Sequence, residues 1–260
     1  MLFPIQYEEI VTQALREGTL APGKRLRPLL LLLALGDLDA DPAIGLDPAC
    51  ALEMIHAASL FLDDMPCMDD DDLRRGKPTV HKVYDEAMAV LTGDSLFAVA
   101  FELLADEATH EDPFVRSELV LELARASGPA GMAGGQVMDI AAETQTFDLP
   151  TTTRLQQLKT GALIGFSVEA GAIMGKVGPA TRLKLKGYAR DLGLAFQIAD
   201  DIIDISSVSG DSGKVPGTDL REGVPTLPII YVLRGTDPGE ARLRETMVEE
   251  IKKRVHEVPA

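Results

Sequence analysis

The chain has 260 residues, of which 46% are hydrophobic and 25% charged, an ordinary composition that suits one large domain with a substantial core. Its formal net charge of −16 makes it a poor general binder of nucleic acid or of an anionic membrane, because both would repel it. An anionic substrate would need a local basic pocket or a bound cation.

Three features of the sequence bear on the compartment in which the protein works. The two cysteines, Cys50 and Cys67, show no zinc-type spacing and indicate a reducing environment. The longest dense apolar run, residues 29–35, is much too short to span a bilayer. Residues 1–4 lack the basic and apolar regions of a signal peptide. We therefore expect a cytoplasmic protein that does not span a membrane.

Helical periodicity recurs along nearly the whole chain, and Leu and Ala dominate the periodic segments. The predicted helices, in chain order, span residues 10–17, 29–36, 49–64, 86–106, 113–127, 135–143, 155–175, 181–206, 225–233 and 238–255. The stretches 39–48 and 207–217 are predicted loops, and residues 151–153 are predicted to cap the helix that follows them. No segment alternates with the period of a strand, so we predict an all-α fold. No repeat or linker divides the chain, and residues 1–260 are predicted to form a single domain.

The first of two acidic clusters follows an apolar helix. Asp63 and Asp64 end that helix, and Asp69 lies six residues after Asp63, which on an ideal helix would turn it well away. Pro66 resolves this, because a proline there should break or bulge the helix and let Asp69 swing back toward Asp63. Residues 70–72 are interpreted as a solvated loop.

The second cluster lies near the end of the predicted helix 181–206. Asp200 and Asp204 are four residues apart, so their carboxylates share one face, and Asp201 flanks them. Isoleucines surround the three aspartates and predict a largely buried segment, where unpaired carboxylates are costly. A hard divalent cation would resolve that cost, and Mg²⁺ typically takes one or two carboxylates plus phosphate oxygens.

Basic side chains suited to diphosphate accompany both clusters, since Arg forks and Lys point charges match phosphate oxygens. They are Lys24, Arg25, Arg27, Arg74, Arg75, Lys159 and Lys214. The Gly-rich stretch 210–217 lacks the P-loop pattern and a preceding strand, which argues against a nucleotide site of that kind. Ser and Cys have no base at a telling spacing, so a hydrolase is not supported.

At these residues the sequence resembles the trans-isoprenyl diphosphate synthases, the polyprenyl synthetase family, over about residues 20–233. The shared motifs are Gly-Lys-x-x-Arg at 23–27, Asp-Asp-x4-Asp with Leu-Arg-Arg-Gly at 63–76, Gly-Gln-x-x-Asp at 135–139, Lys-Thr at 159–160 and Gln-x-x-Asp-Asp-x-x-Asp at 197–204. The resemblance is greatest to geranylgeranyl diphosphate synthases. It implies an isoprenoid synthase-type helical bundle around a deep central cavity, and a homodimer.

The resemblance also implies roles for individual residues. The two aspartate motifs would hold three Mg²⁺ ions on an allylic diphosphate through Asp63, Asp64, Asp69, Asp200, Asp201 and Asp204. Other contacts of that diphosphate network would be Arg74, Asp139, Lys159, Thr160, Gln197 and Lys214. Isopentenyl diphosphate would bind Lys24, Arg27, His56 and Arg75. Within the motif that follows the second cluster, Val224 stands where the family often has Lys.

The implied reaction is a head-to-tail condensation of isopentenyl diphosphate with an allylic diphosphate. Metal ions and basic side chains would neutralise the departing diphosphate, and the double bond of isopentenyl diphosphate would attack the allylic cation. Lys159 would act beside the aspartates as a catalytic group. No protein nucleophile is required, in keeping with the lack of one in the sequence.

Product length in this family depends on side chains four and five residues before the first aspartate. Here these are Ser59 and Ala58, which are both small and predict geranylgeranyl diphosphate or a somewhat longer product. Two alternatives share the fold: a class I terpene cyclase and a catalytically silent regulatory subunit. A cyclase takes one substrate and would not need the second basic set, and a silent subunit would normally show an eroded aspartate motif.

Overall fold

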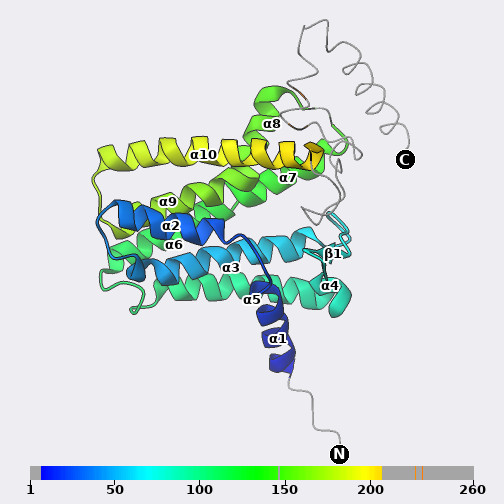
Figure 1. Cartoon of the computed structure of the whole chain (residues 1–260). Coiled ribbons are helices and arrows are strands. Elements are labelled where there is room, and N and C mark those ends of the chain that lie inside the picture. The colour runs from blue at the N-terminus through cyan, green and yellow to red at the C-terminus, as the bar shows by residue number, and fades with distance from the viewer. Residues whose placement is uncertain (1–6, 146, 207–225, 227–229, 231–260) are drawn as a thin grey trace, which may run out of the picture. The chain divides into compact units, whose positions relative to one another are not determined.

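A computed structural model describes residues 7–145 and 147–206, together with Thr226 and Ile230. Helices dominate this part of the chain, which confirms the predicted all-α class (Figure 1). The predicted loop 207–217 with Lys214, the position of Val224 and the predicted helices 225–233 and 238–255 lie outside the described residues, apart from the two single positions above.

Contacts along the backbone divide the chain into two compact units. The first unit comprises Met1–Ser127 and Leu163–Ala189, and the second comprises Gly128–Ala162 and Arg190–Ala260. The division falls within the longest helix, so its two ends belong to different units. Each unit is described by itself below.

The first unit is built around two apolar helices. Its elements are α1 (Tyr7–Thr19), α2 (Leu26–Asp37), η1 (Pro42–Gly45), α3 (Leu46–Asp63), β1 (Leu73–Arg74), β2 (Lys77–Pro78), α4 (Val80–Val83), α5 (Glu86–Ala105), α6 (Pro113–Ser127), most of α9 (Ala162–Met174) and the start of α10 (Pro179–Ser206). Helix α3 lies between α2 and α5 and packs on both (Figure 1). Most of α9 is buried, and it approaches α2 closely at Gly171.

Two segments of this unit are long and apolar enough to cross a membrane by length and composition alone. They are Pro42–Asp63 and Glu86–Ala105, and the apolar windows within them are 50% and 33% buried in the structure. Core helices pass the same test, and the packing of α3 on α5 accounts for much of their apolar character. This is weak evidence for a membrane span.

A short hairpin that the sequence did not predict carries two arginines. Leu73 pairs with Pro78 and Arg74 with Lys77 in antiparallel register. The two residues of the turn, Arg75 and Gly76, have φ values of 53° and 76°, as tight two-residue hairpin turns require. The hairpin therefore fixes the direction of the chain just beyond the first acidic cluster.

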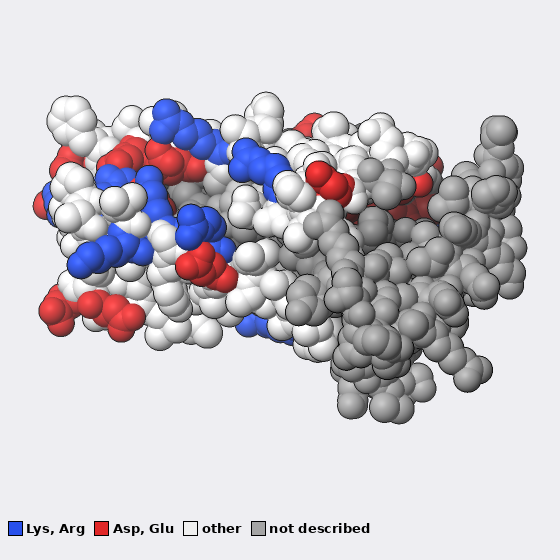
Figure 2. Space-filling view, turned by 90° about the horizontal axis from the view of Figure 1, so that it is seen from above, with Lys and Arg blue, Asp and Glu red and all other residues white. Residues whose placement is uncertain are grey.

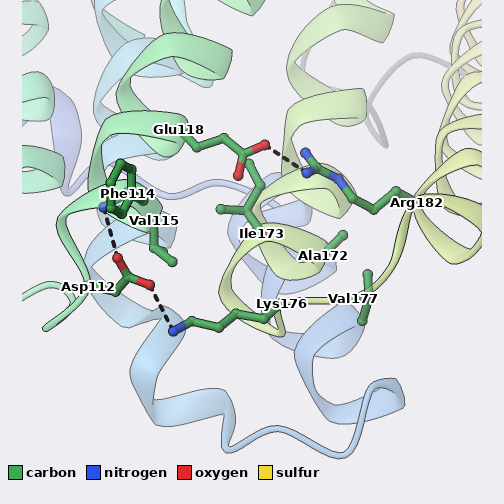
Figure 3. A pocket seen from close by; sticks show the side chains of 9 residues that line it. All are labelled: Asp112, Phe114, Val115, Glu118, Ala172, Ile173, Lys176, Val177 and Arg182. Carbon is green, nitrogen blue, oxygen red and sulfur yellow. Dashed lines mark hydrogen bonds and ion pairs between the residues drawn. The ribbon is translucent and has the colours of Figure 1, made fainter.

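Ion pairs join α6, α9 and α10 around a pocket of about 280 Å³ (Figure 3). Glu118 pairs with Arg182 at 2.7 Å, and Asp112 pairs with Lys176 at 3.0 Å. The buried Glu169 also accepts hydrogen bonds from Arg182. The pocket shares no lining residue with either aspartate cluster. Its four charged lining residues form the two ion pairs named above. Loss of Arg182 would leave the buried Glu169 carboxylate without this donor, which is usually costly, so Arg182 serves the packing of the first unit.

The second unit consists of α7 (Met132–Ala142), α8 (Leu149–Gln156), η2 (Gln157–Gly161) and the end of α10. Asp148, and not the predicted stretch 151–153, caps α8, because its carboxylate accepts a hydrogen bond from the Thr151 amide at 2.9 Å. The predicted continuous helix 155–175 is interrupted by η2, which is a turn of π-helix. Such turns insert an extra residue and often occur at functional sites.

Helix α7 meets η2 through a glycine. A Cβ added at Gly135 would lie 2.2 Å from the Lys159 backbone nitrogen and 2.5 Å from its Cα. These are backbone atoms, which cannot move aside as the end of a side chain can. Glycine is therefore required where the two elements touch.

The remaining boundaries follow the prediction closely. Helix α6 has the predicted bounds, and α5 ends one residue earlier than predicted. Helix α2 begins at Leu26, before Pro28, so the proline lies in the first turn. The predicted loop 39–48 contains η1 and the start of α3.

On the face shown in Figure 2, basic and acidic side chains lie interspersed over the described residues, so this face carries no single large acidic field.

Candidate active site

The first acidic cluster has the local geometry that its proline predicts. Helix α3 ends at Asp63, and the chain then folds back so that the Asp69 amide donates to the Asp63 carbonyl at 2.9 Å. A second bond of the same kind joins the Asp71 amide to the Asp64 carbonyl at 3.2 Å. The backbone of Asp69 thus returns to that of Asp63, which confirms the predicted reversal at Pro66.

Asp64 is the buried member of this cluster, with 2% of its surface exposed. The Arg74 guanidinium donates to Asp64 through Nε and also pairs with Asp71 at 3.2 Å. Burial raises the pKa of the Asp64 carboxyl above its usual range, and the hydrogen bond from Arg74 opposes that rise. Arg74 thereby ties the hairpin to the end of α3.

Residues 70–72 form a loop that reaches solvent, as predicted, and Asp71 is the least exposed of the three, with 46% of its side chain exposed. Asp71 is half-buried because Arg74 draws its carboxylate inward. Asp70 and Asp72 are exposed as predicted, and Asp72 pairs with Lys82 at 2.7 Å. Consecutive aspartates look alike in the sequence, so the sequence does not indicate which of them pairs with which basic residue.

A cationic cluster lies in the same unit, formed by the segment 24–27, helix α3 and the hairpin. Arg27 Nη1 lies 3.2 Å from His56 Nε2. An arginine can only donate, so Nε2 accepts and the imidazole proton sits on Nδ1. Burial and the nearby charges of Arg27 and Arg75 lower the pKa of His56 to about 2. His56 is therefore neutral at physiological pH.

Arg27 itself keeps its charge in this cluster. Burial lowers the pKa of Arg27 to about 10, which still leaves the guanidinium protonated at neutral pH. Its Nε is buried without a hydrogen-bond partner, an arrangement that costs free energy unless a ligand supplies an acceptor. Lys24 and Arg75 are exposed, and Arg75 donates to the Pro22 carbonyl at 2.6 Å.

The acidic and cationic clusters share one helix. His56 and Asp63 are seven residues apart on α3, so they lie on the same face, about 10 Å apart along the helix axis. The consecutive residues Arg74 and Arg75 serve different clusters. Arg74 hydrogen-bonds Asp64 in the acidic cluster, and the charge of Arg75 lowers the pKa of His56 in the cationic cluster. The first unit therefore presents a carboxylate site and a cationic site side by side.

In the second unit, Asp201 is the centre of a chain of hydrogen bonds. Asp201 is 3% exposed and accepts from Gln197 at 2.8 Å and from Gln156 at 3.1 Å, one on each carboxylate oxygen. Thr160 donates to the Gln197 side chain at 2.9 Å. The predicted residues Thr160, Gln197 and Asp201 are thus brought together, and η2 is connected to the end of α10.

The burial predicted for the second aspartate segment is wrong for most of its described residues. Asp200 is exposed, and Ile202 and Ile203 are 49% and 46% exposed. The cause is helical geometry, because among the described residues Gln156 and η2 cover the face that carries Asp201, and Asp200, Ile202 and Ile203 lie on other faces. Asp204 lies within α10, but its side chain is outside the described set.

Lys159 and Asp139, which were both predicted to belong to the diphosphate network, form an ion pair in this unit. The Lys159 ammonium lies 2.5 Å from the Asp139 carboxylate, and both side chains are about one-third exposed. Because η2 presents Lys159 toward α7 and Gly135 lets α7 approach, the ion pair depends on both local features. The two residues therefore lie together, and their role in binding a diphosphate stays a prediction.

Three residues of these networks were missed from the sequence. Gln156 holds Asp201, and it gave no signal because it ends a helix that already contains several polar residues. Arg25 and Glu53 form an ion pair between the segment 24–27 and α3. Arg25 was counted only among basic residues, and Glu53 gave no signal because a single glutamate on a helix is usually solvated.

Ala58 and Ser59, the two residues predicted to affect product length, both contact other residues of the first unit. Ala58 is fully buried in a cluster with Ala57, Phe61 and Leu96. Ser59 is half-buried, and its hydroxyl donates to the His56 carbonyl at 2.8 Å. Ala58 faces α5 and packed aromatic rings. A larger side chain at position 58 should therefore affect the surrounding packing more than one at position 59.

The donor chemistry of both units suits a hard cation. Among the described side chains, no group of three or more His, Cys, Asp or Glu is positioned to hold a metal ion. Each unit taken alone nevertheless offers carboxylates on an ordered backbone. Asp63 and Asp69 are joined through their backbone atoms in the first unit, and Asp200 lies next to the hydrogen-bonded Asp201 in the second. Carboxylate oxygens are the ligands that Mg²⁺ prefers, so the residues fit that ion.

Comparison with known proteins gives the family. The model of the polyprenyl synthetase family matches residues 8–260, almost the whole chain. The chain belongs to the polyprenyl synthetase family. Its relatives are curated prenyltransferases, and it is accordingly an enzyme of the trans-prenyl diphosphate synthase type.

The relatives of this family member make products of different lengths, as their names state. A farnesyl diphosphate synthase of Geobacillus stearothermophilus is 44% identical over 233 residues, covering 89% of this chain and 77% of that protein. Geranylgeranyl pyrophosphate synthase 9 of Arabidopsis thaliana is 41% identical over 247 residues, covering 93% and 68%. A solved FPP/GFPP synthase from Zymomonas mobilis is 47% identical with a TM-score of 0.78, covering 97% and 84%.

Proposed function

We propose that this enzyme condenses isopentenyl diphosphate head-to-tail with an allylic diphosphate to give geranylgeranyl diphosphate or a somewhat longer trans-polyprenyl diphosphate. The observation that carries the proposal is the neighbouring pair of sites on α3, with Asp63 at its end and His56 two turns earlier. A carboxylate site suits a metal-bound diphosphate, and a cationic site suits a diphosphate without metal. Two diphosphate substrates are what this condensation needs.

Members of the family use Mg²⁺, and three ions are proposed here. Asp64 and Asp201 already accept hydrogen bonds from Arg74 and from two glutamines, so these two carboxylates position their neighbours. Asp63, Asp69 and Asp200 are the preferred direct ligands, together with Asp204, which follows Asp200 by four residues on α10. When bound, the metal ions neutralise the negative charge that develops on the departing diphosphate.

The protein's own groups bind and orient the two substrates. Arg74 and Lys159 are proposed to hold the allylic diphosphate, together with Thr160, Gln197 and Lys214. The carbon–oxygen bond of that substrate breaks, and the double bond of isopentenyl diphosphate forms the new carbon–carbon bond. The proton lost from the adduct goes to the released diphosphate, so no protein base is required. Lys24, Arg27, Arg75 and the neutral His56 are proposed to hold isopentenyl diphosphate.

Replacing Ala58 with phenylalanine should shorten the product. The new ring would occupy the space between α3 and α5 where Phe61 and Leu96 already pack, so a growing chain would meet it early. The measurement is the chain-length distribution of products from each primer, separated by chromatography. Ser59→Ala is the matched control, because it keeps the neighbouring position small. An unchanged distribution in Ala58→Phe would show that the floor lies elsewhere.

A homodimer is proposed as the assembly. Helix α5 exposes apolar side chains that include Val90, Leu91 and Val99, which are 38%, 52% and 39% exposed. Exposed apolar side chains on a long helix are suited to burial in a self-association interface. Sedimentation equilibrium measures the assembly directly.

A cytoplasmic location and a single domain spanning residues 1–260 are also proposed. The free cysteines support the location, and the length of the family match supports the single domain.

The reaction is tested by incubating the protein with Mg²⁺, isopentenyl diphosphate and each allylic diphosphate in turn, and identifying the products. The proposal predicts elongated trans-polyprenyl diphosphates with at least one primer. Cyclic hydrocarbons formed without elongation would indicate a class I terpene cyclase instead. A lack of turnover with every primer would leave a silent regulatory subunit as the better account.

A further inference from the structure

An ion pair outside the predicted site ties the segment 24–27 to helix α3. The Arg25 guanidinium donates to Glu53 through Nη1, and the Glu53 side chain is only 13% exposed. Nη2 of Arg25 donates to the carbonyls of Thr19 at 2.8 Å and Ala21 at 2.6 Å. Arg25 therefore directs its donors at protein groups, whereas its neighbours Lys24 and Arg27 are the residues assigned to substrate.

The backbone at Arg25 is held in an unusual conformation. Its φ and ψ are 49° and 33°, the left-handed region that residues other than glycine rarely adopt. Arg25 is the residue before α2, and its carbonyl accepts the first hydrogen bond of that helix, from Leu29 at 3.1 Å. The three side-chain bonds of Arg25 supply the interactions that keep this strained turn in place. The turn sets the directions of Lys24 before it and Arg27 after it.

The same loop is held from its other side by the hairpin. Arg75 donates to the Pro22 carbonyl at 2.6 Å, and a Cβ at Gly23 would lie 2.4 Å from Arg75 Nη1. Two guanidinium groups thus donate to three backbone carbonyls before the turn. Arg25 donates to Thr19 and Ala21, and Arg75 donates to Pro22. Of the two guanidiniums, Arg25 is anchored to a carboxylate on α3.

Glu53 also acts on the charge of the cluster. Its carboxylate favours the charged form of Arg27, whereas Arg75 opposes that form. Glu53, His56 and Asp63 recur along one stripe of α3, so the helix carries an anion, a neutral acceptor and a metal-site carboxylate in that order. Removing the Glu53 charge would leave Arg25, Arg27 and Arg75 repelling one another.

We propose that Arg25 and Glu53 are positioning residues for the diphosphate of isopentenyl diphosphate. Glu53 fixes Arg25, Arg25 fixes the left-handed turn, and the turn presents Lys24 and Arg27 to the substrate. This inference rests on the proposed function, because it assumes that the cationic cluster binds that substrate. It assigns Arg25 no contact with substrate, so its loss should weaken binding of one substrate and leave the chemical step intact.

The test is the affinity for isopentenyl diphosphate measured by calorimetry in EDTA, where no turnover occurs. Arg25→Lys keeps the charge but loses the fork that reaches Glu53 and two carbonyls together. We expect its Kd for isopentenyl diphosphate to rise by about 10-fold. In steady state the KM for isopentenyl diphosphate should rise by a similar factor, while kcat and the KM for the allylic substrate change less than about 2-fold.

Two further variants and a control separate positioning from general stability. Glu53→Gln should raise the Kd as Arg25→Lys does, and Glu53→Asp, which keeps the charge, should recover part of the affinity. These two carry the test if Arg25→Lys does not fold. Arg125→Lys is the control, because Arg125 pairs with Glu122 on the exposed surface of α6 and should change no constant.

The possible outcomes distinguish this inference from the function on which it rests. Wild-type binding together with an unchanged Kd in folded Arg25→Lys and Glu53→Gln would overturn the positioning role alone. A fall in the thermal midpoint with no change in Kd would do the same, since it would mark a purely structural pair. A wild-type chain that fails to bind isopentenyl diphosphate would overturn the assignment of the cationic cluster as well.

Discussion

Replacing Asp200 with alanine is expected to lower kcat by about a thousandfold while the chain stays folded. Asp200 is an exposed carboxylate on α10, and no hydrogen bond within the described residues depends on it, so the helix should tolerate alanine well. The loss falls on the transition state, where the leaving diphosphate carries most charge. The measurement is kcat at saturating substrates, with circular dichroism and the thermal midpoint to confirm the fold.

A control on the same helix makes that result specific. Asp191 is also an exposed aspartate of α10, and it pairs with its neighbour Arg190. Asp191→Ala should therefore keep kcat within about 2-fold of the wild type, as expected for a surface pair of little energetic value. Near-normal turnover in Asp200→Ala would remove the metal role that we assign to the second cluster.

Replacing Gly135 with alanine should impair both stability and turnover. The added methyl group would lie 2.2 Å from the Lys159 backbone nitrogen, so α7 and η2 must separate. Overpacking of this kind typically costs about 1–3 kcal/mol of unfolding free energy. The separation also displaces Lys159 from Asp139, and misplacing a substrate-binding group by about 1 Å can lower the rate by about a hundredfold. Urea unfolding and kcat measure the two effects.

The matched control for Gly135→Ala is Gly187→Ala. Gly187 lies in α10, and an added Cβ would meet no heavy atom within 4 Å. Alanine there should stabilise the helix by up to about 1 kcal/mol and leave kcat unchanged. If Gly135→Ala behaved like this control, the close approach of α7 to η2 would not be what positions Lys159.

The sequence predicted those parts of the site that depend on local rules. Helix periodicity gave α3, α5, α6 and most of α10, and Pro66 gave the reversal that returns Asp69 to Asp63. The family motifs placed Lys159 and Asp139 in one polar network, but their ion pair was not predicted.

The sequence did not predict features that arise from contacts between distant segments. The π-turn η2 has no local signal, since its cause is the packing against Gly135 that places Lys159. Arg25 meets Glu53 across 28 positions, and Gln156 meets Asp201 across 45, so no window of the sequence contains either pair. Apolar neighbours in the sequence predict burial, but the exposure of Ile202 and Ile203 depends on which faces of α10 are packed, and no local pattern encodes that.

We propose that both aspartate clusters bind Mg²⁺ that acts on one allylic diphosphate. A crystal structure of the enzyme with Mg²⁺ and an allylic thiodiphosphate, which ionises slowly, tests it most directly. The account predicts metal ions bound to Asp63 and Asp69 and further metal bound to Asp200, all contacting the same diphosphate. A diphosphate held by one cluster alone, with the other cluster free of metal and remote from it, would contradict the account.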